Sequence, residues 1–129
     1  MVAVALIAAD GRVLMQQRRR GAEHGGLWEF PGGKVEAGES LEESLCREIR
    51  EELCLGLDPL NLEPLSFAAL PGQPYVILLY TCRAWCGTPQ CLDGEAIAWF
   101  EPEVIPELAM PPLDVPLARA LIEHLKRSI

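Results

Sequence analysis

The sequence predicts an α/β or α+β sandwich, in which a mixed sheet lies between helices. Several short apolar stretches of strand length are separated by turn signals. An acidic segment after residue 40 repeats apolar residues at helical spacing, and a second helical pattern lies near the end of the chain. With 129 residues, half of them hydrophobic, the chain is long enough for one domain, 1–129, with a buried core.

Charge and composition narrow the function classes. The net charge of −8 argues against a protein that binds duplex nucleic acid, because such proteins carry basic patches. It leaves a nucleotide substrate open, since a bound metal ion can reverse the local sign of the field. Five cysteines, an odd number, do not suggest a disulfide framework, so we expect a cytoplasmic protein. No stretch is long enough to span a membrane, so we expect no membrane partner.

The first elements are two strands joined by a turn. Val2–Ala9 is an uninterrupted apolar run, which predicts a strand buried on both faces. Asp10-Gly11 is a strong hairpin turn signal, so Val13–Gln17 is expected to return antiparallel. A loop with three arginines follows, and Arg18, at the strand end, is placed to meet an anionic ligand.

A glycine-rich turn then leads into the acidic helix. Pro31 favours a turn, and Gly32-Gly33 permits a close backbone approach to a ligand. Ser40 is a good N-cap, and Glu43, three residues later, completes a capping box. Four apolar residues recur at every fourth position and predict one buried stripe: Leu41, Leu45, Ile49 and Leu53.

The acidic face of this helix has two interpretations. Glu48, Glu51 and Glu52 have the spacing i, i+3, i+4, which puts three carboxylates on one patch. The face can be simply solvated, with Arg47 and Arg50 offsetting the repulsion. Alternatively, three carboxylates beside a glycine-rich loop form a hard oxygen site that suits Mg²⁺ or Mn²⁺.

The second half of the chain predicts more strands and a last helix. The expected strands are 62–70, 75–85 and 97–100, with a turn at 71–74 and a helical turn at 104–108. The last helix is expected at 117–125. Asp114 is a plausible N-cap for it, and Pro116 suits its first turn.

The stretch 33–55 resembles the signature of the Nudix hydrolases. That signature reads Gly, five residues, Glu, seven residues, Arg-Glu-apolar-x-Glu-Glu-x-Gly-apolar. The residues in register are Gly33, Glu39, Arg47, Glu48, Ile49, Glu51, Glu52 and Leu55. The resemblance implies the Nudix α/β/α sandwich and hydrolysis of a nucleoside diphosphate that is linked to another group.

Cys54 stands where the family has Gly. That family glycine lies just past the helix end, where a left-handed residue commonly closes the helix. A non-glycine residue costs about 1 kcal/mol in that conformation. The alternative is that the cap moves to Gly56. Because Cys54 lies beyond the carboxylates, we expect activity to survive.

The resemblance also implies roles within the box. The implied metal ligands are the Gly32 carbonyl and three carboxylates, Glu48, Glu51 and Glu52. Glu39 would orient Arg47 or a metal-bound water. Arg47 would hold the helix carboxylates in place by charge-assisted hydrogen bonds, and a simple helix pair with Glu51 is compatible with that role.

The flanks resemble the MutT branch of the family, which cleaves nucleoside triphosphates, including oxidised ones such as 8-oxo-dGTP, to monophosphate and pyrophosphate. The resemblance rests on the segment 28–34. In that branch a helper acid, usually Glu, binds metal or acts as a base, and Asp93 matches it with a side chain shorter by one methylene. Glu95 could take its place, and both residues could equally lie in a solvated loop.

The residues that would choose the base lie outside the box. Asp114 matches a position where the guanine-oxidation specialist of the branch has Asn. Because an ionised Asp can only accept hydrogen bonds, cytosine nucleotides rival 8-oxo-guanine as substrates. Phe30 could stack on the base or belong to the core. Arg18 and Lys34 are the further candidate substrate contacts.

The main hypothesis is a Mg²⁺-dependent nucleoside triphosphate pyrophosphohydrolase, which would act on a small nucleotide and cleanse the nucleotide pool. One alternative is a CTP- or dCTP-type pyrophosphohydrolase, and another keeps the fold but acts on an ADP-sugar or a dinucleotide. A third, from another class, is a catalytically silent nucleotide sensor, which predicts damaged carboxylates. The sequence leaves monomer and homodimer both open.

Overall fold

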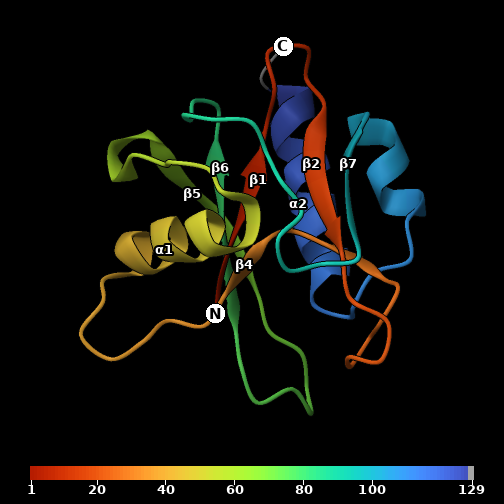
Figure 1. Ribbon diagram of the computed structural model, residues 1–129. Helices are drawn as coiled ribbons and strands as arrows, with labels where there is room; N and C mark the ends of the chain where they lie inside the picture. Colours follow the sequence, from red (N-terminus) through yellow and green to blue (C-terminus); the bar gives the residue numbers. More distant parts are fainter. Residues whose placement is uncertain (128–129) are drawn as a thin grey trace.

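A computed structural model describes residues 1–127 and shows two long helices on opposite sides of a sheet (Figure 1). This arrangement confirms the predicted fold class. The strands divide into two sheets instead of forming a single one. The four-stranded sheet has the order β4-β1-β6-β5, formed by Gly32–Gly33, Val2–Leu6, Ile77–Cys82 and Leu62–Ala68. The three-stranded sheet has the order β3-β2-β7, formed by Trp28–Glu29, Val13–Gln17 and Ala96–Phe100.

Strand β1 lies at the centre of the molecule, and all five of its residues are buried, as predicted. It pairs in parallel with β6 and antiparallel with β4, so the first sheet is mixed. Val2, Val4 and Leu6 face one core, while Ala3 and Ala5 face the other. A continuous apolar run is therefore required, because each face of the strand is covered by a helix.

The hairpin predicted between the first two strands is largely wrong. Within residues 1–127, β2 joins β1 through a single antiparallel bridge, Ile7 to Val13. The whole of β2 pairs antiparallel with β7 on one side, and its last two residues pair antiparallel with β3 on the other. The tight turn itself is present, because Ala8 N–H donates to the Arg12 carbonyl at 2.9 Å. After this turn the chain leaves the first sheet and starts the second.

Helix α1, Leu41–Leu53, begins as predicted with a capping box between Ser40 and Glu43. Leu45, Ile49 and Leu53 are buried against the first sheet. Leu41 is 39% exposed, so its place in the buried stripe was predicted wrongly. Figure 1 shows the first turn of α1 at the end of the helix that lies away from β1 and β4.

The opposite face of the sheet is covered by helix α2, Asp114–Arg127, through Leu117, Ala118 and Leu121. Two short 3₁₀ helices, η1 at Pro59–Asn61 and η2 at Pro102–Glu107, complete the chain. No helix among residues 1–127 is long and apolar enough to cross a lipid bilayer. The two helices thus cover opposite faces of the same sheet.

Cys54 closes α1 in the left-handed conformation, with φ 60° and ψ 32°, so the cap does not move to Gly56. Its N–H donates to the Arg50 carbonyl at 3.1 Å. We expect Cys54→Gly to raise the free energy of unfolding by about 1 kcal/mol, because glycine adopts this conformation without a Cβ penalty. Chemical denaturation measures the change, and kcat is expected to stay within twofold. A tenfold gain in kcat without added stability would contradict this account of Cys54.

Candidate active site

Glycine is required at two adjacent positions, one where the chain lies against β1 and one where it lies against α1. Gly32 and Gly33 form β4, which pairs with β1. A Cβ on Gly32 would lie 2.1 Å from the Val2 carbonyl oxygen. A Cβ on Gly33 would lie 2.4 Å from the carboxyl carbon of Glu48. Gly33 therefore lets the Glu48 carboxylate of α1 pack directly on the main chain, and Gly32 lets β4 lie close against the β1 backbone.

Arg47 is the centre of an ion-pair network on this face. Its Nε and Nη2 donate to both carboxylate oxygens of Glu39, at 2.7 and 3.0 Å. Its Nη1 donates to Glu48 at 3.0 Å and to Glu51 at 3.3 Å, while Nη2 also donates to the Lys34 carbonyl at 3.1 Å. The hydrogen bonds that Arg47 donates to Glu39 are the largest of the effects that raise the pKa of Arg47. The structure thus brings together the box residues that were predicted to act as a unit.

Glu52 lies deeper and is 8% exposed. Its Oε1 accepts hydrogen bonds from Gln16 Nε2 at 3.2 Å and from the Gly32 N–H at 3.3 Å. Burial, followed by the neighbouring Glu48 carboxyl, raises the pKa of Glu52 to about 9. Two carboxyl groups this close and this buried need either a proton or a cation between them.

The donor set suits a hard divalent cation, because the Glu48 and Glu52 carboxyl groups lie together beside the Gly32-Gly33 backbone. The coordination shell is not complete in this conformation. Among residues 1–127, no three His, Cys, Asp or Glu side chains are grouped closely enough to hold a metal ion. Glu51 is the member that stands apart, since its side chain is 59% exposed and pairs with Arg47.

The loop that carries Asp93 is hydrogen-bonded to the end of α1 and to the end of β2. Leu92 N–H donates to the Glu52 carbonyl at 3.0 Å, and Glu95 N–H donates to the Gln17 carbonyl at 2.9 Å. The Asp93 charge contributes to raising the pKa of Glu52, after burial and Glu48. The Glu95 carboxylate instead lies 3.8 Å from Arg20, a mostly exposed side chain. Of the two acids considered for the helper position, Asp93 is the one whose charge acts on Glu52, whereas Glu95 lies beside Arg20.

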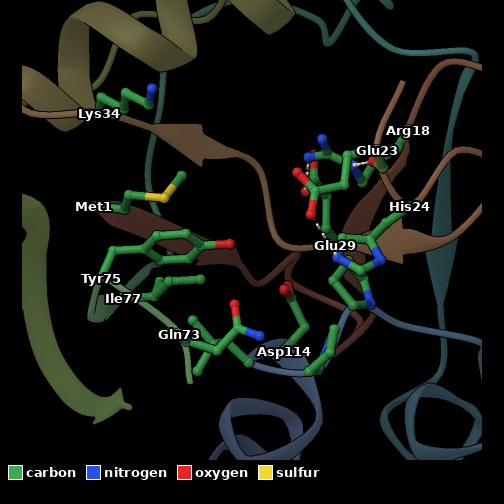
Figure 2. Close-up of a pocket in the computed structure, with 13 residues that line it drawn as sticks. Met1, Arg18, Glu23, His24, Glu29, Lys34, Gln73, Tyr75, Ile77 and Asp114 are labelled. Atoms are coloured by element: carbon green, nitrogen blue, oxygen red, sulfur yellow. Dashed lines mark hydrogen bonds and ion pairs between the residues drawn. The ribbon is translucent and has the colours of Figure 1, made fainter. Parts of the chain in front are cut away.

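A second feature is a cavity of about 300 Å³. It is lined by the connection between β2 and β3, by the connection between β5 and β6, and by the start of α2. Figure 2 shows Asp114 pointing into it, with Tyr75 on one side and Glu29 on the other. The expected N-cap role of Asp114 is wrong, because Asp114 is the first residue of α2 and its Oδ2 accepts a hydrogen bond from the Phe30 N–H at 3.0 Å. Burial raises the pKa of Asp114 to about 7, against the lowering effect of that hydrogen bond.

Of the other predicted substrate contacts, Arg18 and Lys34 line this cavity and Phe30 does not. Arg18 lines it and pairs with Glu29 at 2.9 Å. Lys34 also lines it, at the edge shown in Figure 2. The Phe30 ring is 3% exposed and packs in the core on the α2 side, so the structure does not bring it to the cavity as a stacking surface. Phe30 contributes its backbone N–H instead.

Sequence reasoning missed Gln16, Glu29 and Tyr75. Gln16 follows three buried apolar residues in β2 and is itself 2% exposed. A polar residue inside a buried strand was the available signal. Glu29 gives a weaker signal, because its partial burial and its pairing with Arg18 depend on how the second sheet assembles. Tyr75 lies in the connection between β5 and β6, where no local pattern marks a cavity wall.

Comparison with known proteins gives consistent matches. The family model described as NUDIX domain matches residues 1–125. The chain is 35% identical over 123 residues to the "CTP pyrophosphohydrolase" of Escherichia coli K12, covering 94% of this chain and 90% of that protein. It is 32% identical over 116 residues to the "8-oxo-dGTP diphosphatase" of Haemophilus influenzae, covering 88% and 84%. A solved structure of MutT, from work on Aliivibrio salmonicida and Vibrio cholerae, has a TM-score of 0.83 at 26% identity and covers 95% of each chain.

Proposed function

Because this chain belongs to the NUDIX family, as a MutT-like hydrolase, we propose that it hydrolyses nucleoside triphosphates to monophosphate and pyrophosphate. The observation that carries the proposal is the carboxyl pair of partly buried Glu48 and buried Glu52, set against the Gly32-Gly33 backbone. The relatives named for CTP and 8-oxo-dGTP support a triphosphate substrate. The intact carboxylates argue against a silent sensor.

Nudix hydrolases generally use a divalent metal, and we propose Mg²⁺ here, with Mn²⁺ as a substitute. The proposed ligands are the Gly32 carbonyl and three carboxylates, Glu48, Glu51 and Glu52. When bound, the ion neutralises charge on the phosphate oxygens.

The chain's own residues orient and assist this reaction. Arg47 holds the Glu48 and Glu51 carboxylates from one side, and Glu39 fixes the Arg47 guanidinium with two hydrogen bonds. Asp93 is proposed to accept the proton of the attacking water. The water oxygen bonds to a phosphorus of the triphosphate, and the phosphorus–oxygen bond to the leaving group breaks. Lys34, at the cavity edge, is proposed to contact phosphate oxygens.

The cavity beside the carboxylates is proposed to hold the base. Asp114 and Glu29 give it two acceptors, and Arg18 gives it a donor. Ionised Asp114 accepts from an exocyclic amine such as that of cytosine, and protonated Asp114 can also donate to a guanine oxygen. With its pKa at about 7, Asp114 populates both forms near neutral pH. We therefore propose cytosine nucleotides as one substrate class and oxidised guanine nucleotides as the second.

The proposal extends to the cell compartment, the domain organisation and the partners of the protein. The five cysteines of residues 1–127 are free thiols, which suits a reducing cytoplasm. We propose a single domain over 1–129 that acts on the free nucleotide pool as a monomer or a homodimer. Duplex nucleic acid is not proposed as a partner, because the net charge is −8.

A hydrolysis screen tests the proposal directly. Canonical, oxidised and methylated nucleoside triphosphates are each incubated with the protein and Mg²⁺, and pyrophosphate release is measured beside loss of the triphosphate. We expect equal amounts of monophosphate and pyrophosphate, with CTP or dCTP and 8-oxo-dGTP among the best substrates. Release of inorganic phosphate alone would contradict the proposed bond cleavage. Activity confined to ADP-ribose-type compounds would move the protein to another branch.

A further inference from the structure

Gln16 lies between two carboxyl groups that belong to different parts of the site. Its Nε2 donates to Glu52 Oε1 at 3.2 Å, on the metal side. It also faces Glu29, on the base side. Burial raises the pKa of Glu29, and the Gln16 amide is among the groups that lower it. One side chain on β2 thus reaches both halves of the site.

The loop that carries Asp93 also packs against the Gln16 side chain. A Cβ added to Gly94 would lie 2.7 Å from Gln16 Cγ and 2.6 Å from the Gln17 carbonyl oxygen. The Gly94 backbone therefore packs against the Gln16 side chain. Gln16, Glu29 and Asp93 line a small cavity of about 90 Å³, together with Arg18, Arg19, Ala22 and Gly94.

The Gln16 amide is not explained by stability. The side chain is 2% exposed, and its Oε1 has no hydrogen-bond partner among residues 1–127. A buried polar atom without a partner lowers stability, so an apolar residue would suit the core of this strand better. Such a cost is commonly found where a side chain serves function.

We propose that Gln16 is a positioning residue. Its amide fixes the position of the Glu52 carboxyl, and through it the position of the divalent ion, relative to Asp93 and the base pocket. This inference rests on the proposed function, because it needs Glu52 to hold the ion. Outer-shell partners of metal ligands typically change metal affinity or activity tenfold or more when they are removed. Gln16 acts through Glu52 and is not itself assigned a contact with the substrate.

The test compares Gln16→Met with Gln17→Met. Methionine has nearly the same length as glutamine and removes the amide. Gln17 is the matched control, because it follows in the same strand, points to the opposite side and donates to the Gly26 carbonyl instead. Mn²⁺ binding to the metal-free proteins is measured by calorimetry, beside thermal unfolding and steady-state hydrolysis of the preferred nucleotide.

For Gln16→Met we expect the Kd for Mn²⁺ to rise about tenfold and kcat to fall about tenfold, with KM within twofold and Tm unchanged or higher. For Gln17→Met we expect a Kd and a kcat within threefold of wild type.

Equal Mn²⁺ affinity in wild type and Gln16→Met would overturn the inference, as would a rise in KM at constant kcat. A drop in Tm that accounts for the lost affinity would show a structural role instead, and wild-type protein that binds no Mn²⁺ would also overturn it. Wild-type protein that binds Mn²⁺ but hydrolyses no nucleotide would refute the proposed function, while the Mn²⁺ affinities would still decide the role of Gln16.

Discussion

Glu52→Gln is expected to lower kcat by about 10²–10³-fold, because a carboxylate-held metal ion contributes several kcal/mol to phosphoryl transfer and each 1.4 kcal/mol is a factor of ten. The substitution keeps the size of the side chain and an oxygen that can accept from the Gly32 N–H. It removes the carboxyl that is buried against Glu48. The metal-free variant is therefore expected to be at least as stable as wild type.

Pyrophosphate release with saturating Mg²⁺ measures the loss, and thermal unfolding of the metal-free protein checks the fold. Glu42→Gln is the matched control, because Glu42 lies in the first turn of the same helix, away from the glycine-rich strand. The control is expected to keep kcat within twofold. Full Mg²⁺-dependent turnover by Glu52→Gln would show that Glu52 is not a metal ligand.

Local signals made α1 and its carboxylates predictable. The capping box at Ser40 and Glu43 involves residues three positions apart, and the burial of Leu45, Ile49 and Leu53 follows from their spacing. The sequence limited the left-handed cap to Cys54 or Gly56, and the structure has it at Cys54. Each of these features depends on neighbours within one or two helical turns, so sequence distance and spatial distance coincide.

Features that depend on distant residues were not predictable. The hydrogen bond from Phe30 to Asp114 joins residues 84 positions apart, and it decides that Asp114 faces the cavity instead of the helix end. The pairing of β2 with β7 likewise splits the strands into two sheets. It places Gln16 beside Glu52, 36 positions away. Such contacts are set by how the layers pack, which no short pattern in the sequence records.

Asp114→Asn is expected to shift base preference from cytosine towards guanine nucleotides by about 10- to 100-fold in the ratio of their kcat/KM values. A lost or mismatched buried hydrogen bond costs about 1–3 kcal/mol, which corresponds to that range. Asn presents a donor and an acceptor at every pH, whereas ionised Asp114 only accepts. Asp58→Asn, in the cap of η1 and away from the cavity, is the matched control and should leave the ratio unchanged.

The pH dependence gives the sharper test, because it uses the wild-type protein. Burial raises the pKa of Asp114 from its ordinary value of 3.8 to about 7 in the folded protein, so the folded protein binds more protons than the unfolded chain between these two values. Stability from this group is therefore expected to fall as the pH rises from about 4 to about 7 and then to level off, and Asp114→Asn should lose this slope. The wild-type preference for cytosine over guanine nucleotides should rise as the pH passes through about 7, since the ionised form then dominates. Taking the ratio of two substrates at each pH cancels effects shared by both reactions. A ratio that is flat with pH and unchanged in Asp114→Asn would assign base selection to the opposite side of the cavity, where Glu29 and Arg18 lie.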